Sequence, residues 1–371
     1  MLLLLGAVGC SAWRTVEVRD GWTLYGEKGQ AVDAAAFRAS FDPGYRAVER
    51  VFGPFSENVR VHAITSDKSA VEASMRDVRT IQEVPGIGRA RVQAYHARGD
   101  GVFGPMTGIY ADAPEPGTAV HELVHARIAE IAADLPLWLE EGLACFLGDG
   151  FLDGDEWIVD GYACWPVREL REQRLPDKEL VRVLKLAAAD EASVRENVLV
   201  HFIGWAIVFD LRQEAGTLDW KQWFARYKKG ISVDEARLRI ERTVSRDTEA
   251  AWLERLKSPD RRTRLATAKG LWKLRSRAAV ESLLDAIDRE DDAEVKVALA
   301  VNALAAGGDV KLTDDARDRF WPTVWPALRR GHLNDPAEQE ALRGLYSSYR
   351  RRTQMSSQQA LEGLRRYWAE E

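Results

Sequence analysis

The sequence lacks a surplus of positive charge. Its 371 residues carry 52 basic and 58 acidic side chains, which gives a formal net charge of −6 at pH 7. This balance argues against a general nucleic-acid-binding protein. The sequence also lacks a long apolar run, because Leu2–Val8 is far too short to span a bilayer and no other segment is apolar enough. With 46% hydrophobic and 30% charged residues, the composition is that of an ordinary globular protein of two or three domains.

Cysteine is scarce, with three residues in the chain. The first, Cys10, ends the sequence Ala-Val-Gly-Cys after the apolar run, which resembles a bacterial lipobox, in which the cysteine becomes a lipidated N-terminus. The chain departs from that pattern, because a signal segment has a positive first region and no Lys or Arg precedes the run. We expect residues 1–12 to be a signal-like or lipoprotein-like segment of a bacterial cell-envelope protein, with a membrane contact only through a lipid anchor at Cys10. The alternative is a cytoplasmic protein with a trimmed or incidental apolar terminus.

Histidine is also scarce, but two of the six stand in one short motif, His121-Glu122-Leu-Val-His125. Residues four apart lie on one face of an α-helix, so the two imidazoles can hold one divalent cation, typically zinc. Glu122 is rotated by about 100° from His121 and can stand beside a metal without binding it. A carboxylate in that place can accept a proton from an attacking water. The pattern H-E-x-x-H is a metallopeptidase signature.

The segment after this motif offers a third ligand, which a catalytic zinc site usually needs. Pro136 is expected to end the first helical segment, and a buried second helix is expected from about Leu137 to Phe146. Glu140 and Glu141 are adjacent in it, so their side chains point about 100° apart. One can face solvent while the other faces inward, where a buried carboxylate must be paired or bound to a metal.

Together these motifs resemble the gluzincin metallopeptidases, and most closely the bacterial peptidase MA-like group. The similarity lies in H-E-L-V-H followed by Pro136-Leu-Trp-Leu-Glu-Glu-Gly-Leu-Ala144, and it extends more loosely over 13–242. In that family the Glu before Gly-Leu-Ala is the third zinc ligand, a role that falls on Glu141 here, with Glu140 as the second choice. The resemblance implies zinc-dependent hydrolysis of a peptide or protein substrate, with Glu122 as the general base.

The family also implies further parts of an active site. A His or Tyr from the second subdomain often stabilises the oxyanion, and the candidates here are His201, Tyr162 and Tyr110, although we interpret His201 as a core histidine. In zincin folds an edge strand beside the metal helix pairs with an extended substrate, a role expected for Ala90–Ala97 or Thr107–Ala111.

The other two cysteines leave several roles open. Cys145 and Cys164 could form a disulfide in an envelope compartment, provided that their Cα atoms approach closely enough. Cys145 also follows Glu141 by four residues, so the two lie on one face of a helix. It could therefore neighbour the metal, act as a fourth ligand that closes the site, or simply pack in the core.

Residue patterning predicts several other elements. A hairpin is expected around Asp20-Gly21, a helix over Ala34–Phe52 and a strand over 58–65. The residues 84–90 resemble part of a helix-hairpin-helix DNA motif, but the alternation that follows favours a β-strand. The Gly- and Asp-rich residues 148–161 are expected to form a turn-like loop, whose Asp149, Asp153 and Asp155 lack the ligand series of an EF-hand. Helices are expected over 165–186, 197–212, 220–229 and 233–241.

From Pro259 onward the sequence repeats. Thr263–Trp272 and Val295–Leu304 match at an offset of 32 residues, with an amphipathic helix at Ala279–Ile287 between them. This resembles HEAT-type helical repeats, in which small residues let helices approach closely. Further helices are expected over 320–330, 337–350 and 357–369. A generic helical bundle is the alternative.

The expected fold class is α+β: a zincin-like peptidase domain over 13–258, followed by an all-α, HEAT-like domain over 259–371. The expected function is zinc-dependent peptide hydrolysis, with Zn²⁺ held by His121, His125 and Glu141. The alternative is a catalytically idle, zincin-fold envelope scaffold that binds a protein partner through its helical repeats. A fourth protein ligand on the metal would favour that alternative, since structural zinc sites leave no position open.

Overall fold

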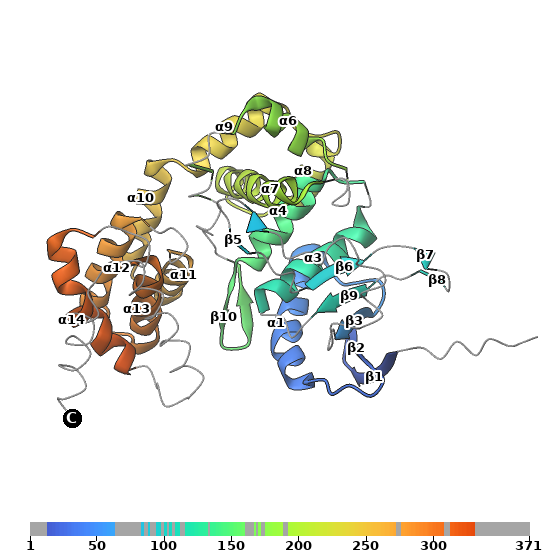
Figure 1. The fold of residues 1–371 in the computed structure, drawn as a ribbon, viewed down its shortest axis with the longest axis horizontal. Coiled ribbons are helices and arrows are strands. Elements are labelled where there is room, and N and C mark those ends of the chain that lie inside the picture. The colour runs from blue at the N-terminus through green and yellow to red at the C-terminus, as the bar shows by residue number, and fades with distance from the viewer. Residues whose placement is uncertain are drawn as a thin grey trace, which may run out of the picture.

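The computed structural model describes residues 13–63, 83–84, 88–89, 94–97, 100–101, 104–105, 108–111, 116–132, 134–159, 167, 170–171, 175–187, 192–271, 276–307 and 312–330. Figure 1 shows one sizeable sheet near the N-terminus, helices α4 and α7 next to it, and a separate group of helices, α11 to α14, toward the C-terminus. The chain is mostly helical, and with its sheet it is compatible with the predicted α+β class. Among the described helices, none is long and apolar enough to cross a membrane.

Among the described residues, five strands form the main sheet in the order β1-β2-β3-β9-β6. They are β1 Trp13–Val18, β2 Trp22–Glu27, β3 Val59–Ala63, β6 Ala94–Ala97 and β9 Gly108–Ala111. The three central strands run parallel, and the two outer ones are antiparallel to their neighbours. Because β9 lies inside the sheet, the expectation that Thr107–Ala111 could be the edge strand is wrong. β6 is an edge of the sheet, and it packs beside helix α3.

The N-terminal predictions of secondary structure are confirmed. β1 and β2 form the hairpin around Asp20–Gly21, where Gly21 has φ of 90°, a conformation that glycine adopts without strain. Helix α1 covers the predicted residues, Ala34–Phe52. A Cβ on Gly21 would overlap the ring of Tyr45 from this helix. Helix α1 can therefore pack against the turn only because residue 21 has no side chain.

Short two-stranded ladders follow β3 in the chain. β4 Glu83–Val84 pairs with β5 Gly88–Arg89, and β7 Asp100–Gly101 pairs with β8 Gly104–Pro105. Within the residues 84–90 that resemble a DNA-binding motif, Val84 and Gly88–Arg89 lie in strands. Most of the alternating residues that follow lie outside the described residues.

The central helices carry many of the buried apolar side chains. They are α3 Pro116–Ile131, α4 Leu137–Gly148, α6 Asp177–Leu184 and α7 Val194–Ala215. Helix α3 packs on α1 and on α4, and α4 packs along α7. A connected set of buried apolar side chains runs through all of them, from Trp22 in the sheet to Ala327 in the last helix.

The expectation of a plain loop after α4 is wrong. β10 Phe151–Asp153 and β11 Glu156–Ile158 form an antiparallel hairpin there. The strands have three residues each, and a tertiary contact holds them in position. The indole Nε1 of Trp157 donates a hydrogen bond to the carbonyl of Leu147 at 2.8 Å. Such contacts leave no periodic signal in a Gly- and Asp-rich segment.

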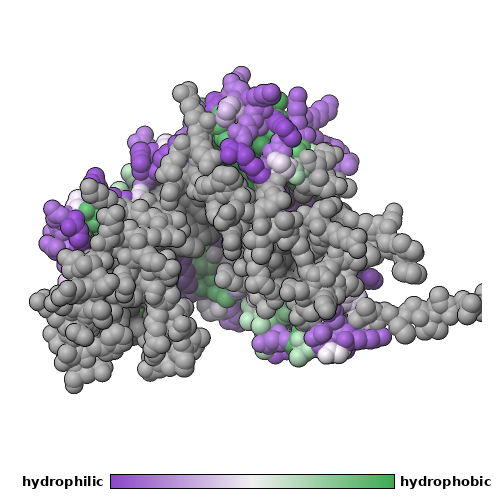
Figure 2. Space-filling model, in the orientation of Figure 1, coloured by the Kyte–Doolittle hydropathy of each residue, from purple (hydrophilic) through white to green (hydrophobic). Residues whose placement is uncertain are grey.

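The remaining helices are α8 Trp220–Tyr227, α9 Val233–Thr243, α10 Arg246–Glu254, the 3₁₀ turn η2 Arg255–Lys257, α11 Arg261–Leu271, α12 Arg277–Arg289, α13 Ala293–Gly307 and α14 Asp314–Arg330. The two matching sequence segments form α11 and α13, which pack against each other with Ala268 and Ala300 fully buried. The helices expected over 337–350 and 357–369 lie outside the described residues. Figure 2 shows hydrophilic residues gathered over α6 and α9 at the top of the molecule.

Candidate metal centre

Two neighbouring helices position the three residues that the sequence predicts as metal ligands. α3 begins at Pro116, whose missing N–H is not needed in the first turn of a helix. Its apolar side chains are buried nearly all round, which holds His121 and His125 one turn apart on the face toward α4. α4 begins after Pro136, whose carbonyl accepts the backbone N–H of Leu139 at 2.9 Å, and carries Glu141 in its second turn.

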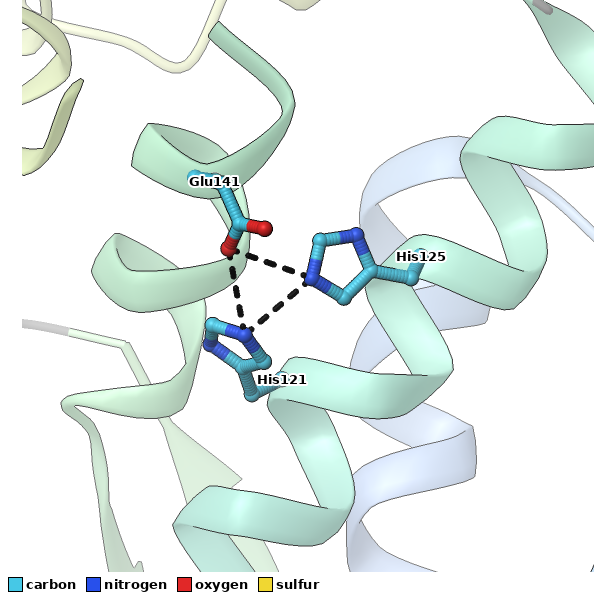
Figure 3. A group of neighbouring side chains, drawn as sticks. All are labelled: His121, His125 and Glu141. Atoms are coloured by element: carbon cyan, nitrogen blue, oxygen red, sulfur yellow. Dashed lines mark hydrogen bonds and ion pairs between the residues drawn. The ribbon is translucent and has the colours of Figure 1, made fainter. Parts of the chain in front are cut away.

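The donor atoms of His121, His125 and Glu141 converge on one point, and all lie within 4.8 Å of one another. Figure 3 shows the two imidazoles and the carboxylate pointing toward one another from the two helices. The two Nε2 atoms are 3.1 Å apart, and Oε2 of Glu141 lies 3.4 Å from Nε2 of His121 and 3.3 Å from Nε2 of His125. A tetrahedral zinc with bonds of about 2.0–2.1 Å holds its ligand atoms roughly 3.3–3.4 Å apart. The spacing of these three atoms therefore fits one face of a zinc site.

The burial of Glu141 also fits a metal site. Its Oε2 is a buried oxygen that has no hydrogen bond of ordinary geometry to any described residue. Burial alone raises the pKa of Glu141, but His201 and His125 outweigh it and hold this pKa well below its ordinary value. A buried, ionised carboxylate is stabilised by nearby cationic groups or by a metal ion.

Glu122, the predicted general base, is buried next to the two histidines. Burial raises its pKa, and the charges of His121 and His125 oppose that rise. A carboxylate whose pKa is raised toward neutrality is suited to accept and return a proton.

No family model, no curated protein and no solved structure matches this chain. What the centre can do therefore follows from its own residues.

His201 also reaches this centre, so its interpretation as a core histidine is wrong. It lies on α7, its Nε2 is 3.0 Å from Oε2 of Glu141, and its ring is parallel to that of His121 at 5.7 Å. Its Nδ1 is 2.6 Å from the carbonyl oxygen of Asn197, which accepts the Nδ1 proton and leaves Nε2 facing the carboxylate. The apolar pattern of α7 hides this role, because one polar residue on a buried helix looks the same in sequence whichever neighbour it meets.

Close contact between the backbones of α4 and α7 brings His201 near Glu141. A Cβ on Gly204 of α7 would lie 2.2 Å from the carbonyl oxygen of Trp138 in α4, and one on Gly142 would lie 2.4 Å from the carbonyl oxygen of Gly204. The two glycines thus let α4 and α7 touch at the level of Glu141 and His201. Of the other oxyanion candidates, Tyr162 lies outside the described residues, and for Tyr110 the structure describes only the backbone, in β9.

The expectation that one of the adjacent glutamates faces solvent is also wrong. The side chain of Glu140 is only 15% exposed, and its Oε1 lies 2.9 Å from Nδ1 of His125, on the ring edge opposite to Glu141. Burial lowers the pKa of His125, but Glu141 and Glu140 outweigh it and raise this pKa well above its ordinary value. Glu140 therefore faces Nδ1 of His125 and not the point where the three donor atoms converge.

Other candidate ligands stay apart from the centre. Cys145 is buried, but its sulfur does not belong to the group of converging donor atoms found among the described residues. Its pairing with Cys164 is untested, because Cys164 lies outside those residues. Asp153 of the β10–β11 hairpin pairs instead with Arg261 and Arg262.

Proposed function

We propose that this protein is a zinc-dependent peptidase in which His121, His125 and Glu141 hold the metal. The observation that carries the proposal is the set of 3.1–3.4 Å separations among their three donor atoms, which fits one face of a tetrahedral site. Neither Cys145 nor His201 belongs to the converging group, which favours a site with an open position over a closed structural one. A fourth protein ligand would favour the alternative, a catalytically idle scaffold, and no such ligand is found among the described residues.

The residues around the metal supply the proton chemistry. When bound, zinc acts as a Lewis acid that polarises the scissile carbonyl and makes water more acidic. Glu122 accepts the proton of the attacking water and delivers it to the leaving amine nitrogen. Protonated Nε2 of His201, which stands beside Glu141, donates to the oxygen that becomes negative in the tetrahedral intermediate.

The sheet edge supplies a place for the substrate. β6 packs beside α3, the helix that carries both metal-binding histidines, and its outer side is an edge of the main sheet. An extended peptide can pair with such an edge through main-chain hydrogen bonds, which give affinity with little dependence on sequence. We therefore propose an extended segment of a peptide or protein as the substrate.

The finer fold and location belong to the same proposal. We propose a zincin-like peptidase domain over 13–258 and a HEAT-like domain over 259–371 that can bind a protein partner. The burial of Ala268 and Ala300 between α11 and α13 supports a repeat of helix pairs. A cell-envelope location with an anchor at Cys10 rests on the sequence alone, since Cys10 lies outside the described residues.

The test is to measure bound zinc and casein hydrolysis for the wild type and three variants. Glu122→Ala is expected to keep zinc and to lose hydrolysis by about 100-fold or more, because the base is removed. His125→Ala is expected to lose both. Glu130→Ala is the matched control, because Glu130 lies on the same helix and pairs with Arg127 instead of the metal group.

Each result bears on a different part of the proposal. Hydrolysis that survives Glu122→Ala would remove the base assignment, and full zinc content in His125→Ala would remove the metal site. A wild-type chain that holds zinc and cleaves no protein substrate would favour the scaffold.

A further inference from the structure

His125 lies between two adjacent carboxylates of α4. Oε1 of Glu140 is 2.9 Å from its Nδ1, and Oε2 of Glu141 is 3.3 Å from its Nε2. The side chains of neighbouring residues in a helix point about 100° apart, and the imidazole ring of His125 lies between the two carboxylates. Both ring nitrogens of His125 thus contact a carboxylate of the dipeptide Glu140-Glu141.

The contact with Glu140 decides which nitrogen of His125 can bind a metal. An ionised carboxylate only accepts hydrogen bonds, so the 2.9 Å contact requires a proton on Nδ1 of His125. In the neutral ring, Nε2 then carries the free lone pair, and Nε2 is the atom that faces His121 and Glu141. A carboxylate on the second nitrogen also makes an imidazole a stronger metal ligand.

His121 is held in a different way. Its ring lies parallel to that of His201 at 5.7 Å with 2° between the planes, and its Nε2 is 3.4 Å from Oε2 of Glu141. The contact of Glu140 with a ring nitrogen is made to His125. Glu140 itself is mostly buried, so water competes little for this contact.

Two simpler roles for Glu140 do not account for this geometry. As a metal ligand it would have to reach the Nε2 side of His125, whereas its Oε1 lies at Nδ1. As an acidic residue in the first turn of α4 it interacts favourably with the helix dipole, but that interaction requires no contact with His125.

We propose that Glu140 is a positioning residue, which fixes the ring orientation and tautomer of His125 and thereby sets the metal affinity of the centre. The inference rests on the proposed function in one respect, namely that this group of residues binds zinc. It requires no peptidase activity.

The experiment measures metal binding by the metal-free full chain, with zinc in competition with a chromogenic chelator and with Co²⁺ as a spectroscopic probe. Glu140→Ala is expected to weaken zinc binding by about 10- to 100-fold and to shift the visible Co²⁺ bands. Glu140→Gln is expected to weaken binding less, because its amide oxygen still accepts the Nδ1 proton but carries no charge. Glu179→Gln is the control, because it removes a first-turn glutamate of α6 that pairs with Arg195.

The outcomes separate the two proposals. Wild-type zinc affinity and unchanged Co²⁺ bands in both Glu140 variants would overturn the positioning role. If Glu140→Ala does not fold, Glu140→Gln decides, since it preserves the size and most of the contacts of the side chain. A wild-type chain that binds zinc but cleaves no protein leaves the positioning role intact and overturns only the peptidase proposal, whereas a chain that takes up no zinc overturns both.

Discussion

One oxygen atom governs the electrostatics of the centre. Oε2 of Glu141 lies 3.0–3.4 Å from the Nε2 atoms of His121, His125 and His201. Without a metal, this oxygen must be balanced by protons on the imidazoles, and with a metal those protons must leave. Metal binding and protonation at these residues are therefore in competition.

The first prediction is that zinc uptake releases protons at pH 7. Burial lowers the pKa of His125, but Glu141 and Glu140 outweigh it and hold this pKa well above its ordinary value, so without a metal His125 keeps its proton to a higher pH than a free imidazole does. Zinc needs the unprotonated Nε2, so binding displaces that proton, and the affinity rises with pH until the raised pKa is passed. Calorimetry in two buffers with different ionisation enthalpies measures the release. Equal heats in both buffers would contradict it.

The second prediction separates His201 from the metal ligands. His201→Ala is expected to keep its zinc and to lower kcat by about 100- to 1,000-fold with a smaller change in KM, because a donor to the oxyanion is removed. Zinc content and steady-state kinetics on one peptide measure both effects. His62→Ala is the control, since His62 packs against Trp13 and Tyr25 away from the centre. Loss of zinc from His201→Ala would instead make His201 a ligand.

At the scale of elements, the crossing of α4 and α7 places His201 beside Glu141. The contact is made by backbone atoms at Gly142 and Gly204, so a side chain at either position has no room. A similar backbone contact joins α3 and α4, where a Cβ on Gly117 would lie 2.5 Å from the carbonyl oxygen of Gly148.

The third prediction is that Gly204→Ala separates these two helices. Its Cβ would lie 2.2 Å from the carbonyl oxygen of Trp138, which cannot move aside as a side chain can. We expect the free energy of unfolding in urea to fall by about 1–3 kcal/mol, and kcat to fall because His201 moves away from the centre. Gly44→Ala is the control, because its Cβ would meet methyl groups of Val120 at 3.1 Å and Leu123 at 3.2 Å, which can shift, and a backbone atom only at 3.5 Å. Alanine also has the higher helix propensity. A larger loss of stability in Gly44→Ala than in Gly204→Ala would refute this account.

Periodic patterning predicts α1, α3, α4 and the β1–β2 hairpin, because each buries one regular set of apolar residues. The spacing of the motif places His121 and His125 on one face of a helix, whereas the choice of Glu141 over Glu140 follows from the resemblance to the gluzincins. Periodic patterning fails for the roles of Glu140 and His201, since these depend on which helix lies opposite. It also fails for the β10–β11 hairpin, whose short strands are held by Trp157.

At the scale of the whole molecule, this hairpin joins the part that contains the candidate metal centre to the C-terminal helices. On one side, Arg50 of α1 pairs with Glu156 at 2.8 Å, and Arg46 donates to the carbonyl of Asp155. On the other side, Lys269 of α11 donates to the carbonyl of Leu152 at 3.1 Å. The hairpin directly follows α4 in the chain. Helix α11 therefore contacts a segment that is continuous with the helix that supplies Glu141.

The last prediction concerns the charges that hold α11 to the hairpin. Arg262 pairs with both Asp153 and Glu156. Arg262→Glu places a third carboxylate beside these two, and we expect a small fall in the free energy of unfolding, because water screens charges in such exposed pairs. The loss should shrink at high salt, which screens exposed charges.

Adding Asp153→Arg to Arg262→Glu restores an opposite-charge pair, so the double variant is expected to recover much of that loss, with an interaction energy that a double-mutant cycle measures. Arg277→Glu is the matched control, because Arg277 lies on α12 and its partner Glu281 belongs to the same helix. Faster cleavage between α10 and α11 in limited proteolysis of Arg262→Glu, and not of Arg277→Glu, would show that the pair holds the two parts together. Equal proteolysis of the two variants would mean that apolar packing alone docks the C-terminal helices.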